Sequence, residues 1–221
     1  MTTSLALFPI ALLTLGVAAC IPAHGVEVRA SKVDQVDLAQ KGIAFSGKLD
    51  AALQVVDRDG AHVLLLTSVR GASHEGASDG RVERIDLLVR YFRRGGNGQQ
   101  GPWMEEWTIK DGVDCPGLDA DAAFFTDAVS VTDVNRDGVA EVSVPYKMFC
   151  GGGIDAETIK IIMRQGREKY ALRGESLVRL PGQAAFGGSY KLDAALALPA
   201  HAAYKNQLLT IWRQVYARRT H

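Results

Sequence analysis

Oxygen-bearing side chains recur at a fixed spacing in one short stretch of this chain. They stand at positions one, three, five and nine of the stretch, as Asp133, Asn135, Asp137 and Glu141, and its sixth residue is Gly138. The seventh residue, Val139, would supply a backbone carbonyl. Calcium takes about six to eight oxygen ligands, and a glycine permits the sharp bend that turns them inward. The stretch is therefore a candidate calcium-binding loop.

The loop is not an EF-hand. Position twelve of an EF-hand is a bidentate acid, but here it is Val144, and no long helical pattern enters the loop. The spacing instead indicates the shorter calcium-type loop that joins two strands, as in the blades of some propeller-like repeats. An ordinary β-turn is the other interpretation, because Asp, Asn and Gly tolerate left-handed backbone and bond their own amides. Both interpretations predict a β-turn between two strands.

Residues 1–25 have the features of an export leader. Leu5 to Ala19 is apolar and ends in small residues, as in a secretory signal, although no Lys or Arg precedes it. Val17-Ala18-Ala19-Cys20 fits a bacterial lipobox, in which Cys20 would be lipidated. The other interpretation is a plain cleaved signal, with Ala23 or Gly25 as further cut sites. We expect an exported protein that meets the membrane only through a lipid on Cys20.

Two cysteines remain once Cys20 is set aside. An even pair in an exported chain predicts a disulfide, here between Cys115 and Cys150. It would close a loop of roughly 36 residues around the acidic stretch, which is worth about 4 kcal/mol in the chain-entropy model. Two separate buried thiols are the alternative. Metal ligation is disfavoured because no histidine lies near either cysteine in the sequence.

The composition gives no support for a nucleic-acid-binding protein or for a protein that spans the membrane after its leader. The chain has 221 residues and a formal net charge of zero, which gives no general argument for binding nucleic acid or an anionic membrane surface. No apolar run after the leader approaches the length that spans a bilayer. Residues 26–221 have the length of a single domain.

Alternating apolar and polar residues predict a mainly β protein. Val82 to Arg93 and Trp103 to Lys110 alternate as half-exposed strands, and the turn at Gln165-Gly166 joins a clear hairpin. Shorter strands are expected at Val26–Gln40, which is otherwise a tether, and at Ile43–Phe45. Asp57–Gly60 is interpreted as a plain turn within a hairpin, and Asp111–Asp127 as a loop.

The C-terminal segment changes to a helical period. Tyr204, Leu208, Ile211, Trp212 and Val215 recur on one helical face, which predicts a helix over about 200–217 that packs on the sheet. A helix that binds a partner or a membrane surface is the alternative. The expected fold is therefore antiparallel sheets and hairpins, in a sandwich or a partial propeller, with one C-terminal α-helix.

Trp103 and Trp107 are candidate glycan-binding residues. They are expected on one face of their strand, where two indole rings could stack on sugars. A sheet cover or a core stripe is the alternative interpretation of the same pattern.

Several short motifs, taken in order, resemble a known family. They are Asp114-Cys115-Pro116, the Asp133–Glu141 stretch, Tyr146, Cys150, Lys169-Tyr170-Ala171-Leu172-Arg173-Gly174, Gly187-Gly188-Ser189-Tyr190 and the helix that contains Trp212. The pattern resembles bacterial exported proteins labelled as surface polysaccharide biosynthesis proteins, over most of the mature chain. The resemblance supports the disulfide. It also implies the periplasm, or an envelope location anchored at the outer membrane, of a Gram-negative bacterium. No active site carries over from it.

One segment departs from that family. Its members tend to have a short charged turn with Ser-Pro after the second cysteine, whereas this chain has Gly151-Gly152-Gly153-Ile154-Asp155. Whatever the turn does in the family is therefore not expected to transfer to this chain.

Two functional hypotheses follow. The first is a non-enzymatic envelope protein, disulfide-closed and calcium-stabilised, that binds a surface glycan or an envelope protein. The second is a polysaccharide-processing enzyme or its accessory subunit. The five histidines are scattered without the spacing of zinc ligands, and nothing resembles a nucleophile motif. Two carboxylates facing each other across a cleft would favour the enzyme, and we favour the envelope protein.

Overall fold

The computed structural model describes residues 27–75, 81–95 and 101–218. The predicted leader, with the lipidation candidate Cys20, lies outside the described residues. Within them, no helix is both long and apolar enough to cross a bilayer.

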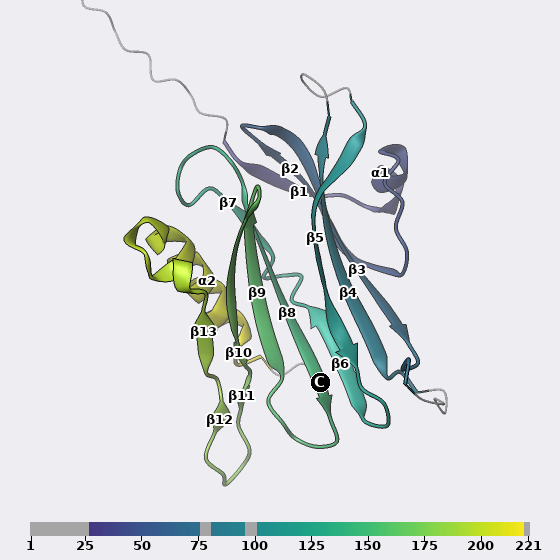
Figure 1. The fold of residues 1–221 in the computed structure, drawn as a ribbon, viewed down its shortest axis with the longest axis vertical. Coiled ribbons are helices and arrows are strands. Elements are labelled where there is room, and N and C mark those ends of the chain that lie inside the picture. The colour runs from purple at the N-terminus through teal and green to yellow at the C-terminus, as the bar shows by residue number, and fades with distance from the viewer. Residues whose placement is uncertain (1–26, 76–80, 96–100, 219–221) are drawn as a thin grey trace, which may run out of the picture.

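Two antiparallel sheets carry most of the described chain (Figure 1). The first has the order β1-β2-β3-β4-β5, with bounds Arg29–Lys32, Lys48–Asp57, Gly60–Gly71, Arg84–Arg94 and Trp103–Asp114. The second has the order β13-β10-β9-β8-β6, with bounds Tyr190–Leu192, Glu168–Glu175, Thr158–Gln165, Glu141–Gly151 and Asp119–Phe124. A short strand β7 (Ser130–Thr132) also pairs with β8, and β11 (Leu177–Val178) pairs with β12 (Phe186–Gly187). The predicted mainly β fold is confirmed.

The two sheets pack face to face on a shared apolar core. Alternation along β3 directs Leu64 and Leu66 toward the second sheet, and Val142 and Val144 of β8 point back toward them. All four side chains are fully buried or nearly so. The architecture is thus a sandwich, in which one face of each sheet forms the central core.

A helical element covers the outer face of each sheet, so that the molecule has four layers (Figure 1). Helix α1 (Gln35–Gln40) packs Leu38 against the outer face of the first sheet. Helix α2 (Ala202–Val215), preceded by two 3₁₀ turns at Ala194–Ala197 and Pro199–His201, packs on the second sheet. The predicted C-terminal helix is confirmed, and all five residues of its predicted apolar face are buried.

Three local expectations need correction. Ile43–Phe45 is not a strand but an irregular segment, and Ile43 is buried on the outer face of the first sheet. The expected tether at Val26–Gln40 does contain an edge strand, but it also contains α1, whose start is fixed by a capping box between Asp34 and Asp37. The expected loop at Asp111–Asp127 is largely extended, since it holds the end of β5 and all of β6.

Trp103 and Trp107 do not share a face, so they form no common glycan platform. The pairing of β4 with β5 runs from Tyr91–Trp107 directly to Phe92–Glu105, which leaves Glu106 as an extra residue in β5. Because one residue is added, every side chain beyond such a bulge points to the opposite face of the sheet from the one that simple alternation predicts. Trp107 accordingly lies in the central core and is 6 % exposed, whereas Trp103 packs on the outer face.

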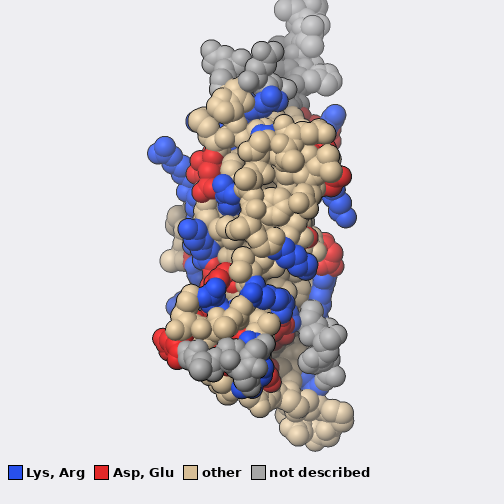
Figure 2. Space-filling view, turned by 90° about the vertical axis from the view of Figure 1, so that its right-hand side faces the viewer, with Lys and Arg blue, Asp and Glu red and all other residues tan. Residues whose placement is uncertain are grey.

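The face on the α1 side of the molecule carries charges of both signs. Figure 2 shows Lys and Arg side chains interspersed with Asp and Glu around a broad uncharged area. The described residues form no continuous basic surface in this view.

Candidate cation site at the junction of the two sheets

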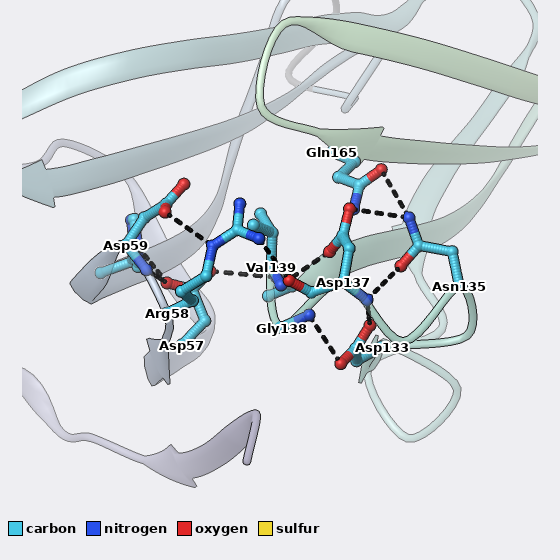
Figure 3. Close-up of polar contacts among 11 residues, drawn as sticks. Asp57, Arg58, Asp59, Asp133, Asn135, Asp137, Gly138, Val139 and Gln165 are labelled. Carbon is cyan, nitrogen blue, oxygen red and sulfur yellow. Dashed lines mark hydrogen bonds and ion pairs between the residues drawn. The ribbon is translucent and has the colours of Figure 1, made fainter. Parts of the chain in front are cut away.

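The acidic loop lies between β7 and β8, and its side chains turn inward onto its own backbone (Figure 3). The Asp133 carboxylate accepts hydrogen bonds from the amides of Asp137 and Gly138, at 2.9 and 3.0 Å. Asn135 Oδ1 accepts from the Asp137 amide at 3.1 Å, and Asp137 Oδ1 accepts from the Val139 amide at 2.8 Å. These bonds to the loop's own amides are common to an ordinary acidic β-turn and to a calcium-type loop.

Glycine at the sixth position is required by the backbone. Gly138 has φ 80°, a left-handed conformation that glycine adopts without steric cost. Arg136 also has positive φ, at 61°, which makes it the exception among the described non-glycine residues. The tight double bend is what brings positions one, three and five to one side.

Glu141, the first residue of β8, closes the loop as a fully buried carboxylate. It is 0 % exposed. Its Oε2 accepts from the Val134 amide at 2.8 Å and from the Thr132 hydroxyl at 3.4 Å, while its Oε1 has no hydrogen-bond partner. Burial, together with the nearby charges of Asp133 and Asp137, raises the pKa of Glu141 to about 7. A buried carboxylate is costly unless it is paired or coordinates a metal.

The loop also docks on the β2–β3 turn of the other sheet. The Arg58 amide donates to the Gly138 carbonyl at 2.8 Å, and its guanidinium donates to the Asp137 carbonyl at 2.5 Å. The Ala140 amide donates to Asp57 Oδ2 at 3.0 Å. Asp57–Gly60 is a turn, as its sequence indicates. Its role as a brace between the sheets depends on contacts about 80 residues away in the sequence, which no local pattern reveals.

The opposite side of the loop contacts the β9–β10 turn and helix α2. Gln165 Nε2 donates to Asp137 Oδ2 at 2.9 Å. The Tyr204 hydroxyl accepts from Asn135 Nδ2 at 2.8 Å and donates to Gln165 Oε1 at 2.7 Å. One nine-residue loop is thus bonded to a turn of each sheet and to the C-terminal helix.

The donor set of the loop is entirely oxygen. The candidate ligands are the carboxylates of Asp133, Asp137 and Glu141, the Asn135 amide oxygen and the Val139 carbonyl. Oxygen ligands of these types bind calcium, whereas softer metals favour sulfur or nitrogen ligands. Within the described ranges, no group of three or more His, Cys, Asp or Glu side chains is arranged to hold a metal ion, so Asp133, Asp137 and Glu141 are not gathered around one point in this structure. The loop's own amides satisfy most of these oxygens, but they leave Glu141 Oε1 without a partner.

A buried histidine lies close to the loop. His62 Nε2 is 3.0 Å from Asp57 Oδ1, and its ring stacks on Tyr91, which in turn stacks on Trp107. The adjoining cavity measures about 30 Å³, which is enough room for an ordered water. His62 therefore packs the junction of the sheets beside the loop.

The predicted disulfide is present at the far end of β8. The Cys115 and Cys150 sulfur atoms are 2.09 Å apart, and their Cα atoms are 5.6 Å apart. Cys115 follows β5 of the first sheet and Cys150 lies in β8 of the second. The disulfide thus ties one sheet to the other.

Replacing Tyr204 with phenylalanine will lower the free energy of unfolding by about 1–2 kcal/mol, because the Asn135 amide and Gln165 carbonyl oxygen lose a shared partner. Urea unfolding measures this. Tyr190→Phe is the matched control, since Tyr190 is 48 % exposed and its hydroxyl makes no hydrogen bond within the described residues. Equal losses in the two variants would show that the Tyr204 hydroxyl does not brace the loop.

In comparisons with family models, with curated proteins and with solved structures, this chain matches none of them.

Proposed function

We propose that this chain is an exported, non-enzymatic module of the bacterial cell envelope, whose Asp133–Glu141 loop binds calcium. The observation that carries the calcium site is the Glu141 carboxylate. It is fully buried at the end of the loop, beside two further carboxylates, and one of its oxygens has no partner. A hard divalent cation would give the unpaired Glu141 oxygen an electrostatic partner, and its positive charge would offset the repulsion among the three acids.

Calcium in this place would act as a structural clamp. The loop already contacts Arg58 from the first sheet, Gln165 from the second and Tyr204 from α2. Fixing the loop therefore fixes the relative positions of the three elements. Such an ion stabilises the native state without taking part in a reaction.

The export and partner assignments rest on the sequence. The apolar leader ending at Cys20 supports export, with a lipid anchor as the membrane attachment. The family resemblance supports a surface glycan or an envelope protein as the partner, in the periplasm or at the outer membrane of a Gram-negative bacterium.

The enzymatic alternative depends on two carboxylates facing each other across a cleft. The nearest arrangement is formed by Asp121 and Glu157, which line a cavity at the disulfide end of the sandwich. Both carboxylates contact the Lys147 ammonium, at 2.7 and 2.6 Å. Because each acid is bonded to this buried ammonium, the pair differs from the two free carboxylates that glycoside hydrolysis uses, and we favour the non-enzymatic assignment.

Calcium will raise the melting temperature of the disulfide-intact protein relative to chelator. At a calcium concentration about a hundredfold above Kd, linkage gives about 3 kcal/mol, or roughly 6–12 °C for a domain of this size. Thermal unfolding with 1 mM calcium and then with excess chelator measures the shift.

The control for this experiment is the neighbouring acidic turn. The double substitution Asp133→Asn and Asp137→Asn should abolish the shift, whereas Asp59→Asn, at a carboxylate 58 % exposed, should leave it unchanged. If millimolar calcium does not raise the melting temperature, or if the rise persists in the double variant, the loop does not bind calcium and is an ordinary β-turn.

A further inference from the structure

A cavity of about 420 Å³ opens at the end of β8 opposite the acidic loop. Its walls come from β6, β8, the β8–β9 loop, β11 and the residues that follow α2. Its volume falls within the range of about 300–1,000 Å³ that is typical of small-molecule sites. Neither the calcium loop nor the disulfide accounts for it.

One side of the cavity is apolar. Leu177, Val178 and Leu180 line it together with the ring of Phe149 and the side chain of Ile154. Leu177 is held in place because its amide donates to the Tyr216 carbonyl at the end of α2, at 2.7 Å. This wall is therefore positioned by two separate elements, and it suits a hydrocarbon body.

The glycine-rich turn after Cys150 contributes the part of the lining that we call the rim. Gly153, Ile154 and Asp155 line it directly. A Cβ on Gly151 would lie 3.0 Å from the Phe149 ring and 3.4 Å from the Asp155 carboxylate. A larger residue at Gly151 would displace the two side chains that define the rim. The segment that departs from the resembling family is thus the one that shapes the cavity.

Carboxylates dominate the charge of the lining. Asp121, Asp155 and Glu157 are the acidic lining residues, and Arg218 is the single basic one within the described residues. Arg218 is engaged elsewhere, since its guanidinium is 2.7 Å from both oxygens of Asp127.

Among the described residues, Asp155 is the lining acid that lacks a cationic partner. Lys147, 3 % exposed beneath the lining, contacts Asp121 and Glu157. Asp155 makes no hydrogen bond or ion pair with any other described residue. The cavity therefore combines an apolar wall with one uncompensated carboxylate at its rim.

We propose that this cavity binds a small organic cation, in which a primary ammonium or guanidinium is carried on a short hydrocarbon chain. The cationic head pairs with Asp155, and the chain lies against Leu177 and Val178. An anion of the same shape is repelled by the three lining carboxylates. A neutral analogue keeps the apolar contact and loses the ion pair.

The test compares three probes of equal chain length on the full, disulfide-intact protein: n-hexylamine, n-hexanol and hexanoate. Binding is followed by chemical-shift changes in protein NMR spectra, in chelator, so that the result does not depend on the calcium site. We expect hexylamine to bind about twofold to fivefold more tightly than hexanol, because a partly exposed ion pair is worth up to about 1 kcal/mol. Hexanoate should bind most weakly.

Two variants locate the site. Asp155→Asn should reduce hexylamine affinity to that of hexanol, and Val178→Trp should fill the cavity and reduce binding of both. Asp86→Asn, at an acid 55 % exposed on the other sheet, is the matched control and should change nothing. Equal affinities for hexylamine and hexanol, or an unchanged hexylamine affinity in Asp155→Asn, would overturn the proposal even if Val178→Trp failed to fold.

Discussion

Replacing Cys115 and Cys150 together with alanine will lower the free energy of unfolding by about 4 kcal/mol. The disulfide joins residues 35 apart in the sequence, and the chain-entropy model assigns about that much to a loop of this length. It also connects the end of β5 in one sheet to β8 in the other, so its loss frees the sheets at that end. Urea unfolding of the variant and the oxidised protein gives the difference.

Alanine is the appropriate replacement because Cys115 is fully buried, and a serine hydroxyl there would need a new partner. The matched control is the unmodified protein after reduction, which should unfold at nearly the same urea concentration as the double variant. A variant within about 1 kcal/mol of the oxidised protein would show that other contacts already hold the two sheets together.

Strand β8 is fastened to the first sheet at both of its ends. At its start, the loop that leads into it receives hydrogen bonds from Arg58 and donates one, through Ala140, to Asp57. At its end, Cys150 is bonded to Cys115. The two fastenings differ in chemistry, because one is covalent and depends on oxidation, while the other is polar and, in our proposal, depends on calcium. Both conditions hold outside the cytoplasm, which is where our proposal places this protein.

Features set by local pattern could be predicted from the sequence. The alternation in β4, the hairpin around Gln165-Gly166 and the apolar face of α2 are each encoded within about a dozen neighbouring residues, and each is confirmed. The cysteine pair was predictable for a different reason. Once Cys20 is set aside, the remaining two cysteines have a single possible pairing.

Features that depend on one extra residue or on distant contacts could not be predicted. The bulge at Glu106 moves Trp103 to the face opposite Trp107, although the spacing of the two tryptophans suggested a shared face. Likewise, the sequence places Tyr204 on the apolar face of the C-terminal helix and gives Arg58 no role, yet both side chains brace the acidic loop. Asp57–Gly60 is interpreted from its sequence only as a plain turn, because nothing local shows that it contacts a loop about 80 residues away.

Replacing Glu141 with glutamine will separate two effects of that carboxylate: its buried charge destabilises the protein without calcium, and the same charge binds calcium when the ion is present. In chelator, the pKa of about 7 in the folded protein exceeds the ordinary value of 4.5. Between these two values the folded state binds more protons than the unfolded state, so the free energy of unfolding falls as pH rises from about 4.5 to about 7. The shift corresponds to about 3 kcal/mol. The Glu141→Gln variant does not lose this free energy of unfolding as pH rises. At pH 8 without calcium, the variant should therefore be more stable than the parent protein.

With calcium present, the parent protein should be more stable than the glutamine variant at pH 8. At pH 8 the ionised Glu141 becomes a ligand, so calcium stabilises the parent protein and its effect grows as pH rises through about 7. The glutamine variant lacks the charge and should gain little. Urea unfolding of both proteins at pH 5.5 and pH 8, with calcium and with chelator, measures all of these differences. A glutamine variant that is less stable than the parent protein at pH 8 in chelator would show that the Glu141 charge is compensated within the chain, and the loop would then need no cation.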